Sequence, residues 1–233
     1  MVEVFPEGFE EREEGGALEL VAYTERPDAV AALEQLGPVR ELAVVVGWED
    51  AWRRFHRPVR IGPLWIGPSW ETPEADATPI VIDPGRAFGT GAHATTRLCL
   101  ELLLGVERSS LVDVGCGSGV LAVAATKLGF APVVALDNDE AAVEAARANA
   151  AANDADVEVL LADAVTDPLP KSEIAVANIA REPVERVAEA FAGGLLIASG
   201  YLRNEVPSAV GWAPVERRLS GEWAADLLTR VGE

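Results

Sequence analysis

The stretch L-V-D-V-G-C-G-S-G-V, residues 111–120, decides how the rest of the chain can be arranged. Its first four residues are apolar except for one acid, and three glycines then follow at alternate positions. A run of good helix-forming residues extends from Val120 to Leu128 and stops at Gly129. We therefore expect a buried strand, a glycine loop and a helix, a unit in which a ligand can approach the backbone closely.

The chain has 233 residues, which is enough for one large domain with a small appendage and a sizeable core. Its formal charge of −19 disfavours binding to nucleic acid, whose phosphates it would repel, and favours a basic partner. The first 50 residues hold 13 acids and 3 arginines. This acidic segment is either a solubility surface or a docking surface for a basic protein, and the sequence leaves both open.

No apolar run is long enough to span a membrane, and residues 1–14 lack the basic and apolar regions of a signal peptide. We therefore expect a cytoplasmic protein that does not bind membranes. Cys99 and Cys116 are the two cysteines, and neither has a histidine or another cysteine at metal-ligand spacing. We expect both to be reduced, with no disulfide and no metal site.

The amino-terminal part predicts a small α+β unit followed by a linker. Its expected elements are two strands around Gly15-Gly16 within 8–24, a helix over 27–36, a strand over 39–46, a linker helix over 48–55, and short strands over 59–61 and 64–66. The unit lacks the first strand and helix of the split βαβ arrangement. The predicted domains are 1–47 for the truncated α+β unit, 48–75 for the linker and 76–233 for the main domain.

The main domain alternates between strands and helices as an α/β fold does. Strands are expected over 80–82, 111–114, 133–136, 157–161, 174–177, 195–198, 215–219 and 223–228, and helices over 96–104, 120–128, 139–152, 183–191 and, as a short stretch, 204–210. Five of these strands end in succession at polar residues. Ligands of open parallel sheets bind at the carboxyl ends of the strands, so we expect the site there.

The glycine spacing indicates which ligand the loop holds. The dinucleotide fingerprint needs G-x-G-x-x-G, whereas here the last glycine comes one position early, which disfavours a pyrophosphate. The pattern G-x-G-x-G after D-V, with an acid about 20 residues later, resembles the class I methyltransferases that use S-adenosylmethionine. This resemblance implies that Gly115 and Gly117 allow close approach, Asp137 accepts the ribose hydroxyls and Asp163 approaches the adenine amino group.

Further motifs narrow the resemblance to one family. The runs F-G-T-G-A-H-A-T-T at 88–96 and V-A-N-I at 176–179, together with S-G at 199–200, G-E-W at 221–223 and W-x-x-A-W-x-x-x-F-x-P at 48–58, are similar to the PrmA family, which methylates ribosomal protein L11. The resemblance implies a Rossmann-like, mostly parallel seven-stranded sheet after an incomplete ferredoxin-like domain. It also implies S-adenosylmethionine contacts at Thr96, Gly115, Asp137 and Asn178, with Phe88 and Thr90 beside the transferred methyl group.

The resemblance thus predicts a protein N-methyltransferase that acts on lysine or N-terminal amines, with ribosomal protein L11 as the expected substrate. We expect Asn178 to orient the amine, and His93 is the one candidate general base, although a lone histidine is more often structural. The alternatives are an enzyme of the same fold acting on a small molecule or another protein, and a cofactor-binding ribosome-interaction factor without turnover. The shortened amino-terminal domain bears on the choice of partner, and a late-assigned start codon would account for it.

Overall fold

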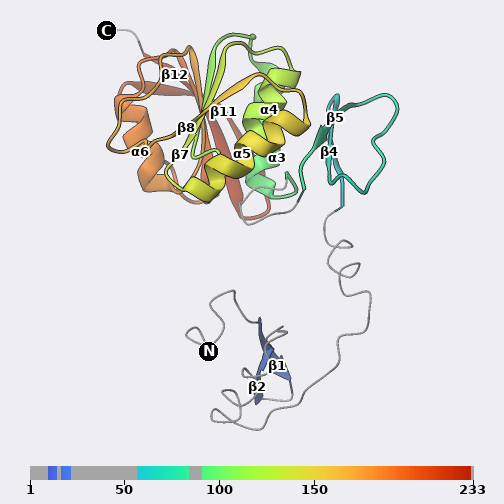
Figure 1. Cartoon of the computed structure of the whole chain (residues 1–233). Helices are drawn as coiled ribbons and strands as arrows, with labels where there is room; N and C mark the ends of the chain where they lie inside the picture. Colours follow the sequence, from blue (N-terminus) through green and yellow to red (C-terminus); the bar gives the residue numbers. More distant parts are fainter. Residues whose placement is uncertain (1–9, 15–16, 22–56, 84–90, 232–233) are drawn as a thin grey trace. The chain divides into compact units, whose positions relative to one another are not determined.

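The computed structural model describes residues 10–14, 17–21, 57–83 and 91–231. The chain divides into two compact units, residues 1–51 and 52–233. In the first unit, β1 (Glu10–Glu14) and β2 (Ala17–Val21) pair antiparallel, with Glu14 opposite Ala17 (Figure 1). This pairing confirms the hairpin expected around Gly15-Gly16. The expected helix over 27–36, strand over 39–46 and linker helix over 48–55 lie outside the described residues, so the domain boundaries predicted there stay predictions.

A seven-stranded sheet forms the centre of the second unit. Its strands are β6 (Leu111–Val114), β7 (Val133–Asp137), β8 (Val157–Leu161), β9 (Ile174–Asn178), β10 (Leu195–Leu202), β11 (Trp212–Ser220) and β12 (Trp223–Arg230). They lie in the order β11-β12-β10-β9-β6-β7-β8. The five strands from β10 to β8 run parallel, and β12 is antiparallel to both of its neighbours. The predicted Rossmann-like, mostly parallel sheet is confirmed.

Helices cover both faces of this sheet. The helices α3 (Ala94–Gly105), α4 (Val120–Lys127) and α5 (Glu140–Ala152) lie on one face, and α6 (Arg181–Ala190) lies on the other (Figure 1). Apolar residues on opposite faces of β6 supply the two cores: Leu111 packs in the α3–α5 core, and Val112 and Val114 pack in the α6 core. This alternation follows from the period of two along a strand. Because both faces are covered, the parallel strands are apolar almost throughout.

A smaller sheet packs against the α3–α5 core. It contains β3 (Val59–Ile61), β4 (Leu64–Gly67) and β5 (Thr78–Val81), with β4 antiparallel to β3 and parallel to β5. Asn153, buried at the end of α5, accepts a hydrogen bond from the Val81 N–H and donates one to the Val81 carbonyl, both at 2.7 Å. The side chain therefore pairs with β5 as a neighbouring strand would, and it joins the small sheet to the main domain.

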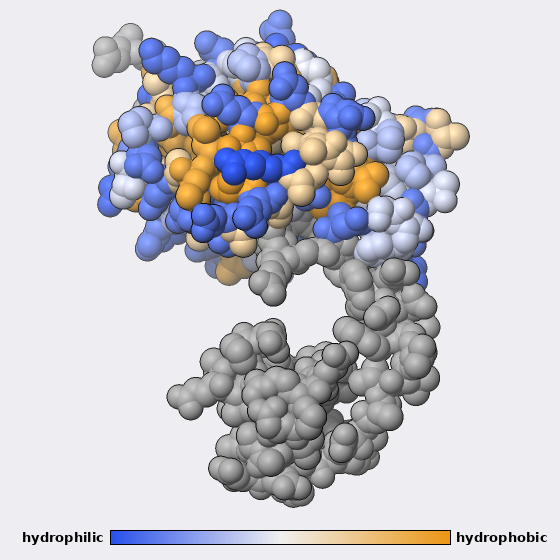
Figure 2. Space-filling view, in the orientation of Figure 1, coloured by the Kyte–Doolittle hydropathy of each residue, from blue (hydrophilic) through white to orange (hydrophobic). Residues whose placement is uncertain are grey.

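Both edge strands carry exposed apolar side chains. Leu161 at the end of β8 is 55% exposed, and Val215 and Leu219 on β11 are 58% and 49% exposed. The face seen in Figure 2 shows an apolar area in its middle, bordered by hydrophilic residues. Pro214 and the charged residues that follow it lie on β11, which is the composition expected of an edge that avoids pairing with another sheet.

One predicted element is wrong. Residues 204–210, expected to be a short helix, run as turns and irregular chain between β10 and β11. Pro207 interrupts the stretch, because proline cannot donate and disfavours helical geometry in the residue before it. Backbone groups of this stretch instead form hydrogen bonds with side chains of α6 and β11. Glu185 accepts from the Ser208 N–H, and Arg217 donates to the Glu205 carbonyl.

Across the described residues, no helix combines the length and apolar character needed to cross a membrane. Within the same residues, no three side chains of His, Cys, Asp or Glu gather in a way that would hold a metal ion. Cys99 and Cys116 are both buried and free.

Candidate functional site

The glycine loop lies where the strand order of the sheet reverses. From β6 the chain proceeds outward through β7 and β8, then returns to place β9 and β10 on the other side of β6. The loop follows β6 directly at the carboxyl edge, which is the position where open α/β sheets bind ligands. Gly115, Gly117 and Gly119 all have a positive φ, at 68°, 52° and 76°. This backbone conformation explains why the loop needs glycine at alternate positions.

The backbone of the loop is already engaged inside the protein. The N–H groups of Gly115 and Cys116 both donate to the Leu136 carbonyl, at 2.8 and 3.0 Å. The next N–H, that of Gly117, donates to Oδ2 of Asp137 at 2.9 Å. A phosphate cradle needs such N–H groups directed at the ligand and no carboxylate beside them. The geometry of these three residues therefore agrees with the glycine spacing in disfavouring a pyrophosphate.

Asp137 ends β7 and holds the neighbouring backbone with both oxygens. Oδ2 accepts from the Gly117 N–H, and Oδ1 accepts from the Asp139 N–H at 3.0 Å. An ionised carboxylate has about four acceptor positions, so two remain for donors on a ligand. The side chain is half-buried, and it therefore presents this capacity at the surface of the loop. A pair of ribose hydroxyls fits this acceptor.

The structure brings together two of the predicted residues that are far apart in sequence. Nδ2 of Asn178, at the end of β9, donates to Oγ1 of Thr96 in α3 at 3.3 Å. Thr96 is buried, whereas Asn178 is half-buried at the carboxyl edge. The next residue, Ile179, packs against the glycine loop so closely that a Cβ on Gly115 would come within 2.4 Å of its Cγ2. Thr96, Gly115 and Asn178 therefore share one end of the sheet with Asp137.

A second carboxylate, Asp113, lies beneath the loop and is 1% exposed. Its Oδ2 accepts from the Ala122 N–H in the first turn of α4 at 3.1 Å, and its Oδ1 has no hydrogen-bond partner in the part of the chain that the structure describes. Burial is the main cause that raises the pKa of Asp113 to about 7, and the charge of Asp137 adds to it. The acid therefore fixes the start of α4 and keeps one buried acceptor atom unused.

Comparison with known proteins agrees with this geometry. Residues 19–225 match the family described as ribosomal protein L11 methyltransferase (PrmA). The chain belongs to the PrmA family. Curated members include the ribosomal protein L11 methyltransferase of Dechloromonas aromatica, 44% identical over 182 residues, and that of Photorhabdus laumondii, 38% identical over 208 residues. These alignments cover 72% and 81% of this chain and 61% and 70% of the two relatives, so the chain matches only part of the length of each relative.

A solved structure of a PrmA relative supports the same assignment. The ribosomal protein L11 methylase of Lactobacillus delbrueckii subsp. bulgaricus superposes with a TM-score of 0.69 at 29% identity, over 76% of this chain and all of that chain. The architecture expected for a PrmA methyltransferase domain is therefore present in this member.

Two of the remaining predicted site residues of this PrmA member, His93 and Asp163, make local structural contacts. His93 caps α3, where its Nδ1 lies 2.8 Å from Oγ1 of Thr95, and its ring meets Trp223 edge-on at 4.9 Å. Asp163 follows β8, and its Oδ1 accepts from the Val165 N–H at 2.9 Å. Phe88 and Thr90 lie outside the described residues. The assignment of site roles to these residues stays a prediction.

Sequence reasoning missed two features of the PrmA site. The sequence shows Asp113 as an acid in an apolar strand. An acid in the centre of a buried strand is itself a signal that its side chain makes a buried polar contact. Gly200 belonged to a family motif without a physical role. It has a φ of 99°, and a Cβ there would lie 2.1 Å from the carbonyl oxygen of Ile179. Only glycine lets β10 pass so close to the residue that follows Asn178.

Proposed function

We propose that this member of the PrmA family is an S-adenosylmethionine-dependent protein N-methyltransferase. The observation that carries the proposal is the glycine loop with Asp137 at its side, in a chain whose relatives are named ribosomal protein L11 methyltransferases. The proposed acceptors are lysine or N-terminal amines of ribosomal protein L11, since a basic protein suits a chain of charge −19.

Residues at the carboxyl edge fit the cofactor. Asp137 offers its two remaining acceptor positions to the ribose hydroxyls, and Asp163 is proposed to face the adenine amino group. Gly115 and Gly117 let the amino-acid part of the cofactor lie against the backbone, and Thr96 is proposed as a further contact. When bound, the cofactor supplies a methyl group on a positively charged sulfur, which an amine can attack directly.

The chain itself would act mainly by positioning. Asn178 is proposed to orient the attacking amine with its amide group, while the bond from its Nδ2 to Thr96 fixes the rotation of the side chain. Holding two reacting centres in contact supplies on the order of 7–11 kcal/mol of a barrier. The amine must lose a proton before it attacks, and we assign that step to water. Nδ1 of His93 is engaged at the start of α3, so any proton transfer by this ring would have to use Nε2.

The test combines labelled methyl transfer with calorimetry. Purified chain is incubated with S-adenosylmethionine labelled in the methyl group and either purified ribosomal protein L11 or a ribosome-free extract. A labelled L11 band supports the proposal, and label in a small molecule or another protein supports the alternative of the same fold. Cofactor binding without label in any acceptor supports the non-catalytic alternative.

Calorimetry then tests the site. Asp137→Ala is expected to abolish cofactor binding, whereas Asp156→Ala, the same change at an exposed acid before β8, should leave the dissociation constant within about twofold. Unchanged affinity in the Asp137 variant would refute the assignment of Asp137 to the cofactor.

A further inference from the structure

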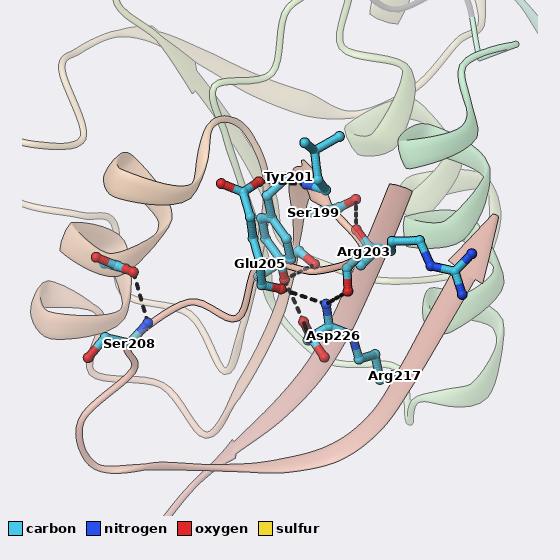
Figure 3. Close-up of polar contacts among 11 residues, drawn as sticks. Ser199, Tyr201, Arg203, Glu205, Ser208, Arg217 and Asp226 are labelled. Atoms are coloured by element: carbon cyan, nitrogen blue, oxygen red, sulfur yellow. Dashed lines mark hydrogen bonds and ion pairs between the residues drawn. The ribbon is translucent and has the colours of Figure 1, made fainter. Parts of the chain in front are cut away.

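A buried polar network lies on the α6 face of the sheet beside the end of β10 (Figure 3). At its centre is Asp226 on β12, which is 4% exposed. Its Oδ2 accepts from the hydroxyl of Tyr201 at 2.8 Å and pairs with Nη1 of Arg217 at 3.2 Å. Burial and the neighbouring Asp226 carboxylate raise the pKa of Tyr201 far above its ordinary value, so the hydroxyl keeps its proton. The pair is thus a fixed internal anchor.

Arg217 connects this anchor to the segment that follows β10. Its Nη2 donates to the carbonyl oxygens of Glu205 and Arg203, at 2.6 and 3.1 Å (Figure 3). One guanidinium thus joins the buried Asp226 to two backbone carbonyls, a planar fork geometry that lysine cannot reproduce. We define residues 202–208 as the strap. Arg217, on β11, therefore holds the strap to the sheet.

The strap in turn holds the first turn of α6. The carboxylate of Glu205 accepts from the Leu202 N–H at 2.7 Å and lies 3.6 Å from Nε of Arg181. Arg181 also pairs with Glu185 at 2.9 Å, and Glu185 accepts from the Ser208 N–H at 2.9 Å. The N-cap of α6, Ala180, has no side-chain hydrogen bond to offer. Contacts to the strap therefore hold the start of this helix through the side chains of Arg181 and Glu185, although they do not cap its free N–H groups.

Helix α6 begins three residues after Asn178. Because the strap contacts Arg181, the first residue of this helix, it holds the chain close to Asn178. The bulge in β10, the strand that leads into the strap, brings Gly200 against the backbone of Ile179, which is a second contact beside Asn178. Asn178 also lies opposite Ser199 in the sheet. A shift of the strap would be transmitted to the turn at 178–181 through both Arg181 and Gly200.

We infer that Arg217 is a positioning residue, which places Asn178 through the strap and the first turn of α6. The expected effect on methyl transfer rests on the proposed function. The expected effect on the structure rests only on the contacts that residues 202–208 make with residues 178–185. It assigns to Arg217 a role in methyl transfer although no bond joins it to Asn178.

The test uses the full chain and variants at both ends of the connection. Arg217→Met removes the fork, Arg217→Lys keeps the charge, and Glu205→Ala breaks the link to Arg181 at a half-exposed side chain without disturbing Asp226. The matched control is Arg218→Met. Arg218 is the next residue on β11, similarly exposed, and pairs with Glu101 and Glu216 away from the strap.

Two measurements decide the inference. In methyl transfer to the protein acceptor, Arg217→Met and Glu205→Ala should lower kcat on the order of 10- to 100-fold, since misplacement by about 1 Å costs that much. Cofactor affinity by calorimetry should change less than twofold. Millimolar guanidinium should restore part of the Arg217→Met activity, and Arg217→Lys should fall between. In hydrogen exchange of the free protein, both strap variants should lose protection at Val184 and Glu185, the first amides of α6 that donate within the helix, and Arg218→Met should not.

Equal losses of kcat in the Arg217 and Arg218 variants, or unchanged exchange at Val184 and Glu185 in Glu205→Ala, would overturn the inference. If Arg217→Met does not fold, Glu205→Ala and Arg217→Lys decide it alone. If the wild-type chain transfers no methyl group to any acceptor, the proposed function fails, and the exchange comparison still decides whether Arg217 positions the turn.

Discussion

Asp113, beside the glycine loop, should lower the stability of the protein as the pH rises from 4 to 8, and replacing it by asparagine should remove this dependence on pH. Asparagine has the same shape and keeps an oxygen that can accept from the Ala122 N–H, as Oδ2 of Asp113 does at 3.1 Å. The other oxygen, Oδ1, has no partner among the described residues, and the amide nitrogen that replaces it would have none there either, which is a cost of the same size at every pH. What the substitution removes is an ionisable group that is buried at 1% exposure and becomes negatively charged above about pH 7, with the thiols of Cys99 and Cys116 and the carboxylate of Asp137 near it.

The size of the effect follows from the pKa. Burial raises the pKa of Asp113 to about 7, against about 3.9 for an unfolded aspartate. Below pH 4 the carboxyl is neutral in both states and costs nothing. Between pH 4 and 7 the unfolded chain releases the proton while the folded chain keeps it, so the free energy of unfolding falls as the pH rises. Raising the pKa from about 3.9 to about 7 lowers the free energy of unfolding by about 4 kcal/mol in total, since each tenfold change in proton affinity corresponds to about 1.36 kcal/mol.

Urea unfolding of both proteins between pH 4 and 8.5 measures this loss. The difference in unfolding free energy, Asp113→Asn minus wild type, should rise with pH by about 4 kcal/mol and level off above pH 7.5. Titration of the groups that do not interact with Asp113 cancels in that difference. Asp156→Asn, the same substitution at an exposed position, shows the effect of the side-chain change alone. A difference that stays constant within about 0.5 kcal/mol over this range would refute the account of a buried, unpaired carboxyl.

Three further substitutions test, in turn, the packing at Gly200, the hydrogen bonds of Asn153 and the role of Asn178. Gly200→Ala should cost at least about 3 kcal/mol in urea unfolding, because its Cβ would meet the Ile179 carbonyl at 2.1 Å; Gly211→Ala, also at positive φ but with open space, should cost only about 1 kcal/mol. Asn153→Ala should lower the unfolding free energy by about 2–4 kcal/mol, because it leaves the N–H and carbonyl of Val81 without their hydrogen-bond partner. A calorimetric melting temperature equal to that of the wild type would contradict this. Asn178→Ala should slow methyl transfer by at least about tenfold with cofactor affinity nearly kept, and equal losses in both would assign Asn178 to the cofactor instead.

The elements that sequence predicted well are those whose signals are local. The strands β6, β7 and β9 are short, mostly apolar runs that end in a polar residue or are followed by glycine, and the structure places β6 and β8 at the expected residues. The predicted helix over 204–210 was wrong although Pro207 is a local signal against it, and the partners that hold the backbone of this stretch, Glu185 and Arg217, are distant in sequence. A sequence pattern holds no information about a carbonyl that is captured by a guanidinium on another strand.

The site was predicted in part, and the missing part is non-local for the same reason. Family motifs supplied Thr96 and Asn178 as separate residues, whereas their hydrogen bond joins positions 82 apart. The motif at Ser199-Gly200 was recognised without its cause, which is the contact between Gly200 and the backbone of Ile179. Such causes become visible only when the register of β9 against β10 is known.

The two acids that flank the glycine loop explain why this loop can receive a ligand at low cost. Asp113 holds the start of α4 through the Ala122 N–H, and Asp137 holds the Gly117 N–H from the next strand. The Leu136 carbonyl fixes the two intervening N–H groups of Gly115 and Cys116. These hydrogen bonds within the protein stabilise the conformation of the loop, so a ligand need not supply them. Glycine at these positions makes the conformation possible, but the carboxylates on either side make it the one conformation that the loop adopts.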